Sequence, residues 1–75
     1  MIIYLNVIAR MTKIGEVIPL KLEWEDGRIF AIDKVLDVRK RASTKGGGMG
    51  LRYTVRILEN QRYLYLADYK WFIEK

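Results

Sequence analysis

Apolar and polar residues alternate along much of this chain, in short runs that are separated by turn residues. The clearest run covers residues 51–58, in which one face is apolar and the other carries Arg and Thr. Alternation with a period of two is the pattern of a β-strand with one buried face. By the same criterion, and from their content of β-branched and aromatic residues, we predict further strands at residues 2–11, 17–24, 28–38, 63–67 and 71–73.

The connections between these runs are short. Residues 13–16, 59–62 and 68–70 are predicted turns. Asp26-Gly27 predicts a tight hairpin, because Gly adopts a positive φ at little cost. Pro19 has no N–H to donate, so the second strand is predicted either to lie at a sheet edge or to begin close to Pro19. The longest predicted loop is residues 42–50, which contain four glycines.

The segment from Arg28 to Arg41 has more than one interpretation. Its alternation slips by one residue at Asp33-Lys34, which indicates either a β-bulge or a break between two strands. A helical spacing is also present, at Ile29, Ile32, Val35, Leu36 and Arg39. A helix over residues 34–41, capped by Asp33, is therefore the alternative. The density of Ile and Val favours a strand.

Five or six short strands cannot bury both faces of a flat sheet in a chain of 75 residues, so we expect the sheet to curl onto itself. The predicted fold is all-β: one domain, residues 1–75, forming a small, strongly bent barrel of the SH3-like kind. An OB-type barrel fits less well, because it usually carries a helix between its third and fourth strands. Side chains are expected to fill the lumen, among them Leu22, Trp24, Phe30, Val55, Ile57, Leu66 and Trp71.

The composition excludes some chemistry and localises the charge. The chain has no Cys and no His, which rules out disulfides, thiolate chemistry and zinc sites of the finger type. The net charge is +5. Six cations and no acid lie between Val38 and Leu58, whereas the rest of the chain carries eight cations and nine acids. The whole positive excess therefore belongs to one continuous stretch, which can create a local field.

This basic stretch predicts a surface for a polyanion. Arg52 and Arg56 project from one strand face, and two earlier arginines join them if the preceding segment pairs with that strand. Two tyrosines that share a face opposite leucines could stack on unpaired bases. The candidate nucleic-acid-binding residues are Arg39, Lys40, Arg41, Lys45, Arg52, Arg56, Tyr63 and Tyr65. The alternative is a solvated hairpin, in which Lys and Arg provide solubility and discourage edge pairing.

The glycine-rich segment 44–48 departs from a phosphate-binding P-loop. In a P-loop the Lys follows the glycines and a helix follows the Lys, but here Lys45 precedes the glycines and a predicted strand follows them. One interpretation is a flexible basic loop that lies over a sugar–phosphate backbone. The other is a hairpin tip without a partner.

Residues that a small barrel needs for its core and turns also form a longer pattern. The pattern is Pro19-x-x-Leu22-x-Trp24-x-Asp26-Gly27-Arg28-x-Phe30-x-Ile32-x-x-Val35-Leu36-Asp37, then Gly50-x-Arg52-Tyr53-x-Val55, then Tyr63-x-Tyr65-Leu66-x-Asp68-x-x-Trp71-Phe72. It resembles a family of small uncharacterised proteins of Gram-positive bacteria over residues 16–74. It is more distantly similar to small domains encoded beside Y-family DNA polymerases. The resemblance implies a role near nucleic acid and assigns no residue roles.

Enzyme chemistry has little support in the sequence. The acids are scattered and lie mostly in turns, and Ser43 is the only Ser, with no His to activate it. A domain of this size is also expected to have little room for a pocket that buries a substrate. We therefore expect no enzymatic activity, no cofactor and no metal site.

The first residues predict the compartment. The apolar run 1–9 is too short to span a bilayer, and its first cation, Arg10, follows the run, whereas a signal peptide carries its charge before it. A cytoplasmic protein without a membrane partner is expected.

Two functions remain as hypotheses. The first is a small accessory protein that binds DNA or RNA weakly and non-specifically through the basic hairpin at residues 38–56. The alternative is a protein-interaction module, which holds a protein partner or a second copy of itself through an apolar and aromatic surface or an edge strand.

Overall fold

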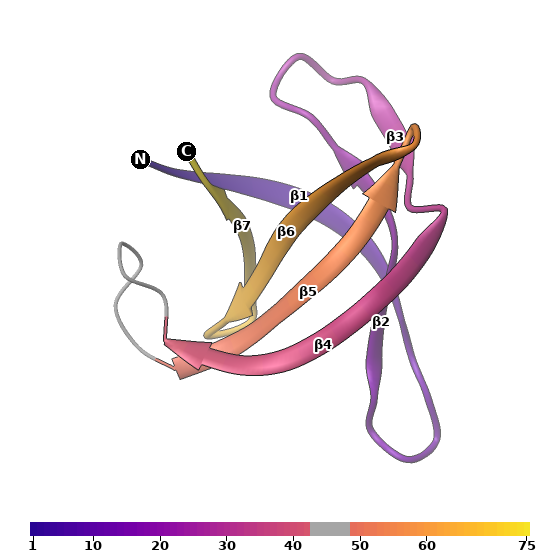
Figure 1. Cartoon of the computed structure of the whole chain (residues 1–75), viewed down its shortest axis with the longest axis vertical. Coiled ribbons are helices and arrows are strands. Elements are labelled where there is room, and N and C mark those ends of the chain that lie inside the picture. Colours follow the sequence, from indigo (N-terminus) through magenta and orange to yellow (C-terminus); the bar gives the residue numbers. More distant parts are fainter. Residues whose placement is uncertain (43–48) are drawn as a thin grey trace.

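Residues 1–42 and 49–75, which the computed structural model describes, form seven β-strands and no helix (Figure 1). The strands are β1 (Ile2–Met11), β2 (Val17–Glu23), β3 (Ile29–Ala31), β4 (Lys34–Ala42), β5 (Met49–Ile57), β6 (Asn60–Ala67) and β7 (Lys70–Glu74). The all-β class is confirmed. The prediction of five or six strands was too low for this part of the chain, because the run that begins at Arg28 contains two strands.

The sheet is antiparallel throughout, in the order β3-β2-β1-β7-β6-β5-β4. Its two edge strands are consecutive in the chain and are joined by Ile32 and Asp33 alone. Three residue steps span at most about 11 Å, so the two edges must approach each other at this point. Ile32 N–H donates to the carbonyl of Leu20 on one side, and Asp33 N–H donates to the carbonyl of Arg56 on the other. The sheet therefore curls into a half-barrel (Figure 1).

The segment that allowed a helix is a strand. β4 pairs with β5 along its length, from Lys34 opposite Arg56 to Ala42 opposite Met49, and the helix over residues 34–41 is wrong. The slip at Asp33-Lys34 is a break between strands, and a register irregularity lies further on, between Val35 and Asp37.

Strand β1 takes part in both halves of the sheet. Residues 2–5 pair with β7, and residues 6–11 pair with β2, with a register shift between Ile8 and Ala9. Opposite this shift lies Pro19, the third residue of β2, whose side chain is fully buried. β2 lies between β1 and β3, so the edge-strand alternative is wrong and the position of Pro19 near the strand start is confirmed.

Backbone geometry supports the predicted turns. Gly15 and Gly27 have φ values of 90° and 89°, which favour Gly. Two-residue turns with positive φ at both positions join the last three strands: Leu58-Glu59 before β6 and Asp68-Tyr69 before β7. This geometry matches the twist of a hairpin. The turn predicted at 59–62 is thus shorter and one residue earlier, and Asn60 already belongs to β6.

Two clusters of apolar side chains line the concave face. One is built around Ile3, Leu5 and Leu22, and the other around Tyr53, Val55 and Leu64. Of the side chains expected in the lumen, Leu22 and Val55 are buried, and the others are half-buried against the clusters: Trp24, Phe30, Ile57, Leu66 and Trp71. Across residues 1–42 and 49–75 the structure contains no helix with the length and apolarity needed to cross a bilayer.

Candidate functional site

The convex face of β4 and β5 carries most of the predicted cations. Arg39 lies directly opposite Arg52, and Arg56 lies opposite Lys34. Arg41 lies opposite Gly50 and so shares this face. The face is the one opposite Tyr53 and Val55, whose side chains are buried in the core.

Two predicted cations are not part of this arrangement. Lys40 is opposite Leu51, so it leaves β4 on the other face of the strand and is exposed there at the sheet edge. Lys45 lies outside the described residues. We call the convex-face set Lys34, Arg39, Arg41, Arg52 and Arg56 the basic face.

A row of aromatic side chains continues from the basic face across the sheet. Tyr65 is opposite Arg52, Phe72 is opposite Tyr65, and Tyr4 is opposite Phe72. The rings of Tyr65 and Phe72 are stacked, with centroids 5.3 Å apart. Tyr4 meets Phe72 edge to face at 5.8 Å. These are favourable aromatic geometries, and they fix the row as a rigid platform.

Arg52 occupies the centre of this surface. Its guanidinium carbon lies 4.5 Å from the centroid of the Tyr63 ring, within the range of a cation–π contact. Its Nε atom is buried and has no hydrogen-bond acceptor in the described structure. A buried donor without an acceptor costs about 1–3 kcal/mol, and the burial of this atom shields it from an external acceptor as well.

The basic face contains few compensating acids. Arg39 forms an exposed ion pair with Asp37, with 2.7 Å between Nε and Oδ2. Arg41, Arg52 and Arg56 form no ion pair with any residue in the described ranges 1–42 and 49–75. An exposed pair such as Arg39–Asp37 contributes little to stability and competes weakly with a ligand.

Tyr65 is held in its protonated form. Burial raises the pKa of Tyr65, and a hydrogen bond to Glu74 and the charge of Glu74 raise it further, while Arg52 and Arg41 lower it. The Tyr65 hydroxyl therefore remains a donor, and the carboxylate of Glu74 is its acceptor.

The predicted aromatic residues are not equivalent. Tyr63 and Tyr65 do share the face opposite Leu64, as predicted, but Tyr63 is 47% exposed whereas Tyr65 is packed against Phe72. Tyr4, 60% exposed, belongs to the same surface and was not predicted. The alternation of Ile3 and Leu5 with Tyr4 places Tyr4 on an outer face, but only the pairing of β1 with β7 brings it beside Phe72.

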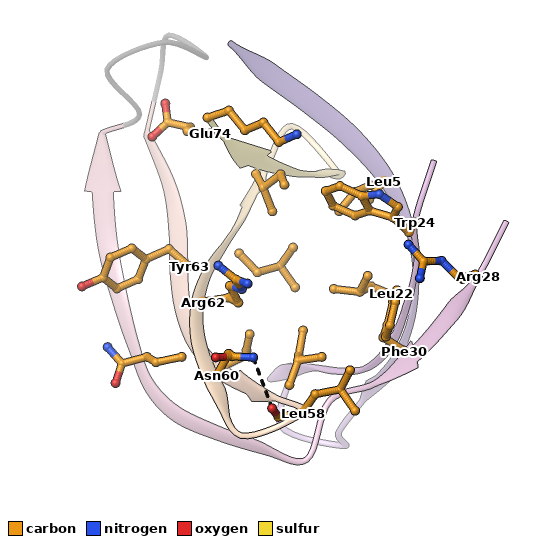
Figure 2. A pocket seen from close by; sticks show the side chains of 16 residues that line it. Leu5, Leu22, Trp24, Arg28, Phe30, Leu58, Asn60, Arg62, Tyr63 and Glu74 are labelled. Atoms are coloured by element: carbon orange, nitrogen blue, oxygen red, sulfur yellow. Dashed lines mark hydrogen bonds between the residues drawn. The ribbon is translucent and has the colours of Figure 1, made fainter. Parts of the chain in front are cut away.

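A second feature, a cavity, lies inside the half-barrel (Figure 2). Its volume is about 710 Å³, and its apolar wall includes Leu5, Leu22, Trp24, Phe30, Val55, Ile57, Leu64 and Ile73. Figure 2 shows Leu5, Leu22 and Phe30 on one side and Arg62 reaching inward from the other, while Tyr63 points away. The side chains thus do not fill the lumen completely, and a hollow that is partly open to solvent remains.

Cations line the cavity together with aromatic rings. The Arg28 guanidinium lies 5.4 Å from the centroid of Phe30, and Lys75 Nζ lies 5.5 Å from the ring of Trp24. Arg28 also forms an exposed ion pair with Asp26, at 2.6 Å. This ion pair and a backbone hydrogen bond from Arg28, the larger effect, keep the pKa of Asp26 below its ordinary value.

Comparison with protein-family models, curated proteins and solved structures found no match to this chain.

Proposed function

We propose that this protein binds single-stranded nucleic acid, weakly and with little sequence preference, through the basic face and the neighbouring tyrosines. The observation that carries the proposal is the cross-strand row Arg39–Arg52–Tyr65–Phe72–Tyr4, which joins positive charge to an aromatic surface. Lys and Arg attract the phosphates, and exposed aromatic rings stack on bases of any identity.

A single strand fits this surface better than a duplex. The exposed ring of Tyr63 contacts the Arg52 guanidinium, and the exposed ring of Tyr4 lies at the far end of the aromatic row. Bases must be unpaired to stack on these rings. The guanidinium of Arg52, which forms no ion pair within residues 1–42 and 49–75, supports the same proposal, because a phosphate oxygen is a strong acceptor for a guanidinium. Lys45 is proposed as an additional cation.

The wider role belongs to the same proposal. We propose an SH3-like small barrel that acts in the cytoplasm as an accessory to a larger DNA-processing machine. The resemblance to small domains encoded beside Y-family polymerases supports this role. The bent β1 strand, which is shared between both halves of the sheet, supports the SH3-like class.

The decisive experiment is a polarisation titration with a labelled single-stranded oligonucleotide at increasing salt. Wild-type affinity should fall steeply, with a logarithmic slope of about −0.7 for each phosphate that is neutralised. The double reversal Arg39→Glu with Arg41→Glu should abolish binding. A matched control, Arg10→Glu with Lys13→Glu at the tip of the β1–β2 hairpin, changes the net charge equally and should weaken binding much less. Equal losses in the two double variants would contradict the basic face as the binding surface.

A second candidate function rests on a different surface. The β1–β2 hairpin exposes three large apolar side chains, Ile8, Met11 and Ile14. Such a surface is typical of a protein-interaction site, for a partner protein or a second copy of this chain. Concentration-dependent association in light scattering, without oligonucleotide binding at low salt, would favour this candidate over the first.

A further inference from the structure

The cavity inside the half-barrel is large for a protein core. A hollow of about 710 Å³, partly open to solvent, lies here among β1, β2, β3, β5, β6 and β7. This volume is within the range of sites for small molecules, which are mostly apolar with a few polar groups. The wall of Leu22, Val55, Leu64 and their neighbours satisfies the first condition.

An opening follows from the strand pairing. β6 and β7 pair only from Tyr65 opposite Phe72 to Ala67 opposite Lys70. Beyond Tyr65 and Phe72 the two strands separate, and β6 continues to pair with β5 while β7 continues to pair with β1. Arg62 and Leu64 of β6 and Ile73 of β7 line the cavity from the two sides of this gap. No β6–β7 ladder pairing closes this part of the cavity wall.

Arg62 provides the polar group. It is opposite Val55, so its side chain leaves β6 on the concave face, and Figure 2 shows it extending into the cavity. The other lining charges already interact: Arg28 with Asp26, Lys75 with Trp24 and Glu74 with Tyr65. Arg62 forms no ion pair with any residue outside the segment 43–48.

We propose that the cavity binds an amphipathic monocarboxylate, with its hydrocarbon body against the apolar wall and its carboxylate on Arg62. One unpaired guanidinium in an apolar cavity is complementary to one negative charge, and the planar fork of Arg matches a carboxylate bidentately. The apolar body gains free energy in proportion to the apolar area that it removes from water. This site is on the opposite side of the sheet from the basic face, so the two activities can be tested separately.

The test uses dodecanoate as the probe, below its micelle concentration, with dodecanol as the neutral analogue. Calorimetry and amide chemical shifts should show saturable dodecanoate binding, with shifts at Leu22, Phe30, Ile57 and Ile73. Dodecanol should bind at least about tenfold more weakly, because it lacks the negative charge that makes the bidentate contact with Arg62. Arg62→Gln should reduce dodecanoate affinity to the level of dodecanol.

Two further variants distinguish binding of dodecanoate in the cavity from non-specific attraction of this anion to surface cations. Arg56→Gln removes a cation from the convex face and should leave dodecanoate affinity unchanged. Ile57→Trp should fill part of the cavity and abolish binding of both probes. Arg62 is exposed, so Arg62→Gln remains informative even if Ile57→Trp does not fold. Absence of saturable binding, shifts at Arg39 and Arg52 instead of the wall, or equal losses in Arg56→Gln and Arg62→Gln would overturn the proposal.

Discussion

Arg39 and Arg52 are directly opposite each other on β4 and β5, on the same face of the sheet. Like charges in this position destabilise a strand pair, so each guanidinium needs another partner. Arg39 pairs with Asp37 of its own strand, and Arg52 lies over the ring of Tyr63 on β6. The pair is therefore tolerated, and a bound anion would relieve the remaining repulsion.

Arg52→Gln separates binding from stability. The variant loses a cation–π contact of about 0.5–1 kcal/mol, but it also removes the repulsion with Arg39. We expect the free energy of unfolding to change by less than about 1 kcal/mol in urea denaturation. The salt slope for single-stranded oligonucleotide should become shallower by about 0.7. Lys13→Gln, in the β1–β2 turn, is the control, and an unchanged slope in Arg52→Gln would count against the proposed contact.

Tyr53→Phe tests the contact that joins the two sides of the half-barrel. The Tyr53 hydroxyl on β5 donates to the carbonyl of Val17 on β2, with 2.5 Å between the oxygens. Removing it leaves that carbonyl without this donor and should lower the free energy of unfolding by about 1 kcal/mol. Tyr69→Phe, at a fully exposed turn position, should have no effect. Equal stabilities of the two variants would show that the hydrogen bond contributes nothing.

Gly50→Ala should disturb the sheet at Gly50 of β5, which lies opposite Arg41 of β4 and next to the end of β6. A Cβ atom at Gly50 would clash with the carbonyl oxygen of Leu66 and lie 2.8 Å from Ala67 Cβ. Because backbone atoms must move, we expect a loss of about 1–3 kcal/mol in thermal or urea unfolding and weaker oligonucleotide binding. Gly15→Ala is the control: its Cβ meets no atom, and only its φ of 90° is strained. It should leave oligonucleotide binding intact.

Stability should fall at alkaline pH. Burial, and to a smaller extent the charge of Glu16, raises the pKa of Tyr53 above its ordinary value of 10.0, and the pKa of Tyr65 is raised as well. The folded state therefore holds these protons more tightly than the unfolded state. The contribution is complete below pH 10.0 and is lost as the pH rises through the folded-state pKa values. Urea unfolding across this range should show the decrease, and Tyr65→Phe should make it smaller. A flat profile in the wild type would contradict the shifts.

Local pattern was sufficient for most of the secondary structure. Alternation over residues 51–57 and around Tyr63 identified β5 and β6 and the faces of their side chains, because a strand has a period of two in any sheet. The pattern could not show whether the slip at Asp33-Lys34 is a β-bulge or a break between two strands. A bulge and a strand break produce the same pattern, and the difference lies in distant hydrogen bonds to Leu20 and Arg56.

The candidate site also has one part that the sequence could predict and one part that it could not. The clustering of Arg39, Arg41, Arg52 and Arg56 could be predicted once a hairpin was assumed, because register then determines which side chains share a face. The position of Tyr4 beside Phe72 could not be predicted from the sequence, because β1 and β7 are at opposite ends of the chain.

The amino-acid sequence alone determined the all-β class, the approximate positions of most turns and the charge asymmetry of this protein, because these depend on side-chain chemistry and short-range periodicity. Only the tertiary structure decided the strand order, the aromatic row and the cavity. Each of these arises where segments distant in the chain approach each other, and the cavity is lined by residues from six strands of the curled sheet.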